Sequence, residues 1–271
     1  MTLARGHSGS LAVSLLFDRD NRPHFSDLQR LSQNAGGFAV TERAENAGGE
    51  ISYSSAHEWP TSESAELLMN GLTFDIIGIA PGESDKAPEY QYRFGFDEEI
   101  YPAGYKSITL MPSPHLQSSI AMPPVVRGLA GLAAKLTWLK DVRAVAWHGA
   151  RSLIEAQFYR KAVTVWLSGG PFPAAGLTAF ATMPDGGFQT QGLALLIGQE
   201  LRLEPELVQN YPDASQKIAL RLIHWVIENG PITAKSFASL ADMPRLFLIP
   251  SNNGFFVRVA AEGYPGGGHA G

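Results

Sequence analysis

The alternation of hydrophobic and polar residues is most regular between Gly187 and Pro205, where the sequence reads GFQTQGLALLIGQELRLEP. A turn signal, Pro184-Asp185-Gly186-Gly187, comes directly before it. A period of two residues is typical of a strand with one face buried and the other in water. The pattern therefore predicts one long strand, with residues 178–183 as its hairpin partner. Its apolar face would be Leu193, Leu195, Ile197, Leu201 and Leu203.

Shorter patterns predict the other elements. Strands are expected over residues 11–17, 51–55, 72–80, 106–111, 142–147, 246–249 and 255–259. A first helix would start at the capping box Ser26-Asp27-Leu28-Gln29, and further helices are expected over 63–69, 123–139, 151–159 and 213–229. Gly128 and Gly131 weaken the 123–139 helix, so we expect them to allow close packing against a sheet.

The order of these elements predicts an α+β fold. It reads β-α-β-β-α-β twice over, which is typical of two ferredoxin-like units with mostly antiparallel sheets. No proline- or serine-rich linker separates the halves, so we expect them to pack as one body. The prediction is one domain over residues 1–262, with sub-units 1–140 and 141–262, and a flexible glycine-rich tail over 263–271.

Composition removes several functional classes. The chain has 271 residues, 45% of them hydrophobic, a formal net charge of -5 and no cysteine. The absence of cysteine excludes disulfides, cysteine-ligated zinc and thiol catalysis. The mildly acidic balance argues against a general affinity for nucleic acid or anionic lipid. The apolar run at 11–17 leads directly into charged residues with no cleavage site, which favours a strand and a cytoplasmic location over a signal peptide.

Three segments resemble one bacterial family. They are Leu110-Met111-Pro112-Ser113-Pro114, the strand Ala144-Val145-Ala146-Trp147, and Thr190 to Leu193 continuing through Glu200 to Glu204. Together they resemble the family catalogued as domain of unknown function 4261, over roughly residues 107–230. Where that family often has an aromatic residue after the Pro-x-Pro, this chain has His115. The resemblance implies a bacterial α+β domain, and it brings no reaction and no catalytic residues.

Catalytic chemistry has few candidates. No Walker-type loop, GxGxxG, HExxH or GxSxG is present. His115 and His148 each follow a predicted strand, and together with Glu98 or Asp97 they would suit a general acid and base or a metal. Surface loop positions are the competing interpretation for both histidines. The acidic run at 97–99 is more typical of a solvated loop than of a cation site, so no metal and no cofactor are predicted.

Aromatic residues occupy every second position from Tyr90 to Phe96. On a strand, Tyr90, Tyr92, Phe94 and Phe96 would share one face, with Arg93 on the other. Three interpretations stay open: rings packed on the core, a partner or dimer surface, and a platform on which single-stranded nucleic acid stacks. An acidic run follows at once and would repel phosphate, which counts against the third.

These observations favour a non-catalytic binding or adaptor protein that acts through protein contact or self-association, with Tyr90, Tyr92, Arg93, Phe94 and Phe96 as its binding residues. The first alternative is a hydrolase-type enzyme that uses His115 and His148 with an acidic residue. The second is single-stranded nucleic-acid binding through the aromatic strand. A membrane role is not predicted.

Overall fold

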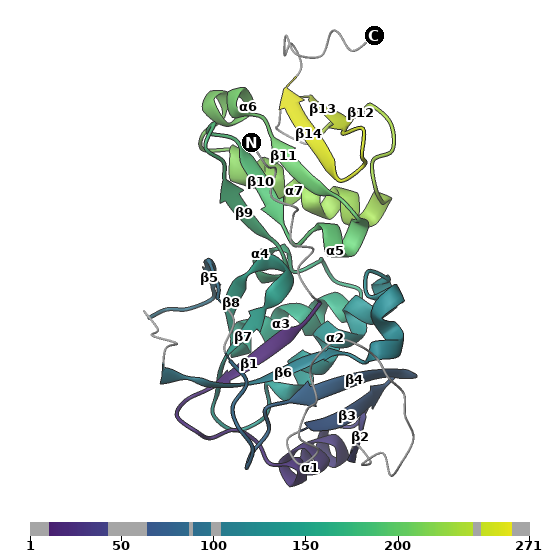
Figure 1. The fold of residues 1–271 in the computed structure, drawn as a ribbon. Helices are drawn as coiled ribbons and strands as arrows, with labels where there is room; N and C mark the ends of the chain where they lie inside the picture. Colours follow the sequence, from purple (N-terminus) through teal and green to yellow (C-terminus); the bar gives the residue numbers. More distant parts are fainter. Residues whose placement is uncertain (1–10, 43–63, 87–88, 99–103, 241–244, 262–271) are drawn as a thin grey trace, which may run out of the picture.

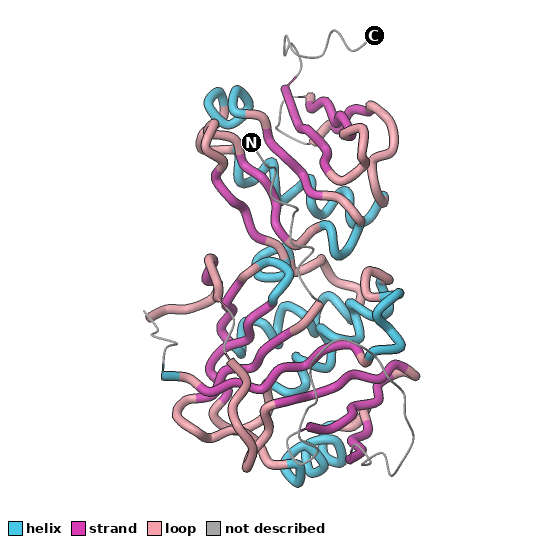
Figure 2. Tube along the Cα trace, viewed as in Figure 1, coloured by secondary structure: helices cyan, strands magenta, loops and turns pink. Residues whose placement is uncertain are grey.

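The computed structural model describes residues 11–42, 64–86, 89–98, 104–240 and 245–261, which form two β-sheets with helices packed against them. Figure 1 shows the two sheets as separate lobes, the eight-stranded sheet below and the six-stranded sheet above. Both lobes contain helices as well as strands (Figure 2), so the predicted α+β class is confirmed. The strand expected at 51–55 lies outside the described residues.

The larger sheet has the strand order β2-β3-β4-β6-β1-β7-β8-β5. Every neighbouring pair is antiparallel except β5 and β8, which run parallel. Its centre is β1, so the first strand of the chain is paired on both sides. The strands are β1 (Val13–Phe17), β2 (Ala39–Glu42), β3 (Ser64–Met69), β4 (Leu72–Ile77), β5 (Tyr92–Phe94), β6 (Lys106–Pro112), β7 (Val142–Trp147) and β8 (Ser152–Glu155).

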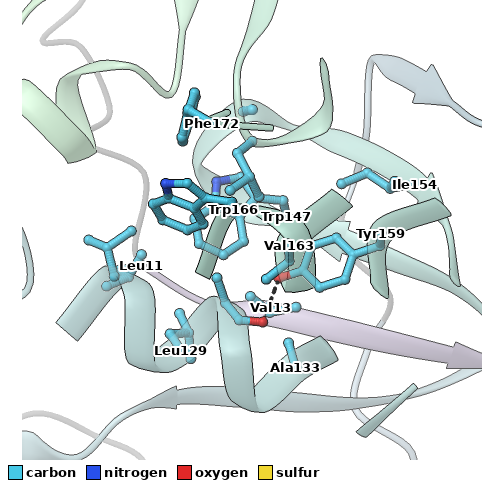
Figure 3. Close-up of a cluster of buried hydrophobic side chains, with 14 of the residues drawn as sticks. Leu11, Val13, Leu129, Ala133, Trp147, Ile154, Tyr159, Val163, Trp166 and Phe172 are labelled. Carbon is cyan, nitrogen blue, oxygen red and sulfur yellow. Dashed lines mark hydrogen bonds between the residues drawn. The ribbon is translucent and has the colours of Figure 1, made fainter. Parts of the chain in front are cut away.

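Helices cover one face of this sheet and form the main core with it. α2 (Pro123–Leu136) and α3 (Ala156–Leu167) lie side by side on that face, and α1 (Phe25–Ala35) lies beside β2. Figure 3 shows Trp147 of β7 and Trp166 of α3 in this core, with the Tyr159 hydroxyl donating to the backbone oxygen of Ala130. Two short 3₁₀ helices, η3 (Pro114–Ser119) and η4 (His148–Ala150), follow β6 and β7.

The glycines of α2 bring it close to its neighbours, as expected. A Cβ atom on Gly128 would lie 2.9 Å from the ring of Phe74 on β4, so this position confirms the predicted approach to the sheet. A Cβ atom on Gly131 would lie 2.8 Å from Leu167, so this glycine instead admits α3. Small residues are therefore required on both contact faces of α2.

The smaller sheet has the order β12-β13-β14-β11-β10-β9. It consists of two antiparallel meanders joined by one parallel pair, β11 with β14. The strands are β9 (Ala179–Thr182), β10 (Phe188–Gln191), β11 (Glu200–Leu203), β12 (Ser236–Ala238), β13 (Leu246–Pro250) and β14 (Phe256–Ala261). The helices of this lobe are α4 (Ala174–Leu177), α5 (Ala194–Ile197), α6 (Pro205–Asn210) and α7 (Ser215–Asn229).

The predicted long strand at Gly187–Pro205 is wrong, because two glycines interrupt it. Gly192 and Gly198 have φ values of 91° and 76°, which are left-handed and end strand geometry at both places. The segment between them forms α5, so the chain turns back and β11 pairs beside β10. The predicted hairpin partner is confirmed, since β9 pairs with β10.

Two predicted helices are also strands in part. Residues 63–69 were predicted to be helical, yet residues 64–69 form β3, in which buried side chains alternate with less buried ones from Ala65 onward. Asn70 and Gly71 both have positive φ and make the two-residue turn of a β3–β4 hairpin rather than a helix stop. The helix expected at 151–159 begins only at Ala156, after β8, and Glu155 caps it by accepting from the Phe158 amide at 2.6 Å.

The helix α1 is present, but its capping box lies two residues earlier than predicted. His24 is the N-cap residue, and its backbone N–H donates to the Asp27 carboxylate at 2.9 Å.

The chain leaves the first sheet after Glu155 and enters the second at Ala179, whereas the sequence placed a division near residue 140. Buried residues of both lobes belong to one contiguous cluster. The two ferredoxin-like units stay a prediction.

Candidate functional site

The face of the larger sheet opposite α2 and α3 has polar groups at its centre. Along β1, Val13 and Leu15 join the core beneath the helices, whereas Ser14 and Leu16 point to the opposite face. Ser14 lies opposite Thr109 of β6 in the strand register, and both side chains are buried. Buried hydroxyls need hydrogen-bond partners, and those partners define the candidate site.

A chain of four side chains runs across this face. His148 Nε2 lies 2.8 Å from Ser14 Oγ, and Ser14 Oγ lies 2.7 Å from Thr109 Oγ1. The Thr109 hydroxyl in turn donates to the Asp85 carboxylate. We call these four residues, His148, Ser14, Thr109 and Asp85, the hydroxyl chain. It links an imidazole on η4 to a carboxylate that lies beside β6.

The hydrogen bonds of the hydroxyl chain have one consistent direction. Because Thr109 gives its proton to Asp85, its oxygen must accept from the Ser14 hydroxyl. Ser14 then has no proton left for His148, so the imidazole Nε2 carries a hydrogen and donates to Ser14. A serine activated as a nucleophile requires the opposite direction, with the imidazole as acceptor.

Burial sets the charge state of the imidazole. The largely buried position lowers the pKa of His148 below its ordinary value, and the nearby Asp85 carboxylate offsets this only partly. The ring is therefore neutral near pH 7 and serves as a hydrogen-bond donor. Ser14 is fully buried, so no substrate reaches its hydroxyl in this conformation.

Backbone contacts hold Asp85 in place. Its N–H donates to the Ser107 carbonyl at 3.1 Å, and the Ser107 hydroxyl donates to the Asp85 carbonyl at 2.8 Å. Gly78 makes this approach feasible, because a Cβ atom there would lie 2.8 Å from Asp85 N and 2.9 Å from Ser107 O. The acidic end of the hydroxyl chain thus depends on a glycine seven residues before it.

The structure does not bring His115, His148 and Glu98 together. His115 lies on η3, where its Nε2 is 3.0 Å from the Thr73 hydroxyl of β4. His148 instead contacts Ser14 of β1, and β6 lies between β4 and β1 in the sheet. Glu98 is exposed, and no hydrogen bond joins it to either histidine among the described residues. The carboxylate that reaches His148 through the hydroxyl chain is Asp85.

The aromatic strand lies at the edge of the larger sheet, as β5. Tyr92 and Phe94 are half-buried against the main core, and burial raises the pKa of Tyr92. Tyr90 and Phe96 pack on the opposite face over a small cluster that includes Leu16. The four rings therefore divide between the two faces, and all of them contact buried residues. Arg93 is exposed, with its guanidinium 5.5 Å from the centre of the Tyr90 ring.

Exposed acids on this lobe form no ion site within the described residues. Asp97 and Glu98 are exposed, and residue 99 lies outside the described part of the chain. In the described ranges, no group of three or more His, Asp or Glu side chains is arranged to hold a metal ion. Across the same ranges, no helix combines the length and the apolar character needed to cross a bilayer.

Sequence reasoning missed three members of the hydroxyl chain. Ser14 is the single polar residue of the apolar strand LAVSLLF, and Thr109 alternates with Ser107 in SITLM, and these interruptions were the available signal. Both hydroxyls point to the same face only because β1 and β6 pair in this register. Asp85 had no signal, because it reaches Thr109 through a turn that local patterns do not specify.

A second feature is a group of exposed aromatic side chains on the smaller sheet. Inner positions of β13 and β14 pack toward α7, so the alternate positions point to the opposite face. On that outer face Phe237 pairs with Phe247, their ring centres 4.5 Å apart, and Phe256 lies farther along β14. Phe237 and Phe256 are 47% and 37% exposed. We call Phe237, Phe247 and Phe256 the phenylalanine face.

Three comparisons with known proteins found no relative. No protein-family model, no curated protein and no solved structure matches this chain. The resemblance to the domain of unknown function 4261 therefore stays a prediction.

Proposed function

We propose that this chain is a non-catalytic protein-binding module, and that it binds through the phenylalanine face. The observation that supports this most directly is the exposure of Phe237 and Phe256 on a sheet whose other face is already filled by α7. A polar residue at these exposed positions would cost the fold nothing. The presence of aromatic residues there therefore favours a contact surface. Aromatic side chains are also enriched at binding hot spots.

The charge around this face favours a different protein over a second copy. Arg245 lies 4.1 Å from the centre of the Phe237 ring, and Arg258, which forms an ion pair with Glu204 at 2.6 Å, lies on the same face of β14. A two-fold contact centred on Phe237 would bring two Arg245 guanidinium groups toward each other, which is repulsive. An acidic partner surface with apolar side chains complements both the rings and the guanidinium groups. We therefore assign the face to such a partner.

The aromatic strand β5 is a weaker contact surface than the phenylalanine face. Its rings already contact buried residues on both faces of the sheet. A partner that gripped Tyr92 and Phe94 would have to draw them away from the core. Stacking of single-stranded nucleic acid on these rings has the same cost, and the exposed acids at Asp97 and Glu98 add repulsion to phosphate.

The test compares capture by a double variant of the phenylalanine face with capture by a control variant that changes one exposed apolar side chain on the other lobe. Phe237→Ser/Phe256→Ser removes the phenylalanine face, and Val165→Ser removes an exposed side chain (46%) on α3 in the other lobe. Cross-linked complexes from the native host would be quantified for wild type and both variants. Each captured protein would then be purified, and its affinity for wild type and for each variant measured by titration. We expect at least a tenfold loss of affinity for the double variant, which is about 1.4 kcal/mol, and none for Val165→Ser.

Thermal unfolding serves as the control on these variants. The substituted rings are partly exposed, so we expect nearly unchanged melting temperatures. A directly binding partner that is retained equally by the double variant contradicts the proposed surface. A purified chain that instead forms a concentration-dependent dimer, lost in the double variant, would replace the heterologous partner with a second copy.

A hydrolase is the second candidate, because Ser14 Oγ and His148 Nε2 lie 2.8 Å apart, within the range of a nucleophile and its base. It ranks second because Ser14 is fully buried and the hydroxyl chain makes His148 the donor. If it is an enzyme of this class, a fluorophosphonate probe should label wild type and fail to label Ser14→Ala. We expect no labelling of either protein, and labelling that depends on Ser14 would displace the binding proposal.

A further inference from the structure

A groove of about 460 Å³ lies beside α1 in the lobe with the larger sheet. One wall is a stripe of α1 that includes Asp27, Arg30 and Asn34, and the facing wall is the turn between α2 and β7. Its volume falls within the range of small-molecule sites, roughly 300–1,000 Å³.

A buried arginine fixes the loop at one end of the groove. Arg22 donates to the Asp20 carboxylate and to the carbonyl oxygens of Gly78 and Gly82, each at 2.7 Å. The Arg22 hydrogen bond lowers the pKa of Asp20. These three bonds occupy the guanidinium within the wall, so Arg22 shapes the groove and does not serve as a ligand contact. The Asp20 side chain remains 62% exposed and can accept further hydrogen bonds.

Trp138 forms an aromatic platform at the rim of the groove. It is 65% exposed, whereas Trp147 and Trp166 are buried in the core. Arg160 lies 3.9 Å from the centre of the Trp138 ring and donates to the Thr137 carbonyl at 3.3 Å. The indole is therefore held from one side by a cation–π contact while much of its surface stays in water. Such an anchored exposed ring is preorganised for a ligand that stacks on it.

The charges of the lining cancel. Three carboxylates (Asp20, Asp27 and Asp141) face three cations, and all are paired: Arg30 with Asp27, Arg22 with Asp20, and Lys140 with Asp141 at 4.0 Å. A balanced lining gives no net attraction for a phosphate or another anion. The amides of Asn21 and Asn34 add both donors and acceptors. The groove therefore suits a neutral ligand that is rich in hydroxyl groups.

We propose that this groove binds a neutral saccharide. A pyranose ring presents a face of polarised C–H groups, which an electron-rich indole face attracts, and hydroxyls along its edge that carboxylates and amides can bond. The Trp138 platform supplies the first contact, and Asn34 and Asp141 lie among the polar groups available for the second. A nucleoside fits less well, because apart from Trp138 the apolar lining is limited to Leu31, Leu139 and Pro23, which leaves little apolar surface to enclose a base. This site lies on a different lobe from the phenylalanine face.

Saturation-transfer NMR on the full chain tests the proposal. The probes are glucose, N-acetylglucosamine and maltotriose, each at about 20 mM, since single-site saccharide contacts of this kind would have affinities near the millimolar range. We expect transfer to the ring protons of at least one probe. Trp138→Ala and Asn34→Leu should each reduce that transfer at least fivefold, while Phe255→Ala, which removes an equally exposed ring (62%) from the other lobe, should leave it unchanged.

A folding control keeps the result decisive. Trp138→Phe retains an aromatic ring and should keep part of the signal if Trp138→Ala proves unstable by circular dichroism. The proposal is overturned if none of the three saccharides shows transfer, or if transfer persists in both Trp138→Ala and Asn34→Leu. It is also overturned if adenosine displaces the saccharide at lower concentration, since the groove would then be a nucleoside site.

Discussion

Alanine at Gly192 is expected to lower the free energy of unfolding by about 3 kcal/mol. The φ value of 91° alone costs an alanine about 1–2 kcal/mol. The added Cβ would also lie 3.0 Å from three atoms: the Cβ and backbone N of Ala150 and the carbonyl oxygen of Leu177. Two of these are backbone atoms that cannot rotate away, so overpacking adds about 1–3 kcal/mol. Urea unfolding with linear extrapolation measures the loss.

Gly198 is the matched control for this prediction. It has a similar φ of 76°, yet nothing lies within 4 Å of the position its Cβ would take. Gly198→Ala should therefore cost only the conformational part, about 1 kcal/mol. Equal losses at the two sites would mean that η4 and the chain after β10 are not closely packed, and the contact between the lobes would need revision.

Glutamine at Glu200 is expected to remove a pH dependence of stability worth about 3 kcal/mol. Burial raises the pKa of the Glu200 carboxyl from 4.5 to about 7. Between those pH values the folded chain holds a proton that the unfolded chain has released. Stability from this group is therefore fully present below pH 4.5 and declines as the pH rises through 7. Wild type should lose that stability between pH 4.5 and 8 relative to Glu200→Gln.

Glutamine keeps the contacts of the protonated carboxyl. Glu200 Oε1 accepts from the N–H groups of Gly192 and Ala194 at 2.9 and 3.0 Å, and a glutamine oxygen can do the same. The glutamine NH₂ can donate to the Thr190 hydroxyl, which lies 2.5 Å from the other oxygen. Urea titrations of both proteins at pH 5 and pH 8 provide the comparison. Parallel pH profiles would show that Glu200 keeps an ordinary pKa and that its neighbours stabilise the charge.

Much of the fold could be predicted because its strands and helices carry clear periodic patterns. β6, β7, α2 and α7 lie close to the ranges that the sequence indicated, since each buries one continuous face. The errors fall at positions where glycine geometry overrides periodicity. Gly192 and Gly198 divide a stretch whose apolar residues largely follow a two-residue period, and Asn70-Gly71 turns a segment that composition alone made helical.

The candidate sites could be predicted only in part, because they depend on contacts across strands. His148 was singled out for its place after a strand, and it does join a polar network. Its partners Ser14 and Thr109 come from strands 95 residues apart in the chain, and only the β1–β6 register places them together. Trp138 and the groove beside α1 had no signal at all, since exposure of a single tryptophan cannot be read from periodicity.

The position of β14 has a consequence for the order in which the smaller lobe is built. This strand lies between β13 and β11, and its parallel partner β11 ends more than 50 residues before it begins. While a ribosome is still making residues up to 261, β9, β10 and β11 can form only half of the sheet, with the edge of β11 open to other chains. Closing so long a loop is slow, so this edge stays exposed longest. The nascent chain is thus most prone to mispairing just before its smaller sheet is completed.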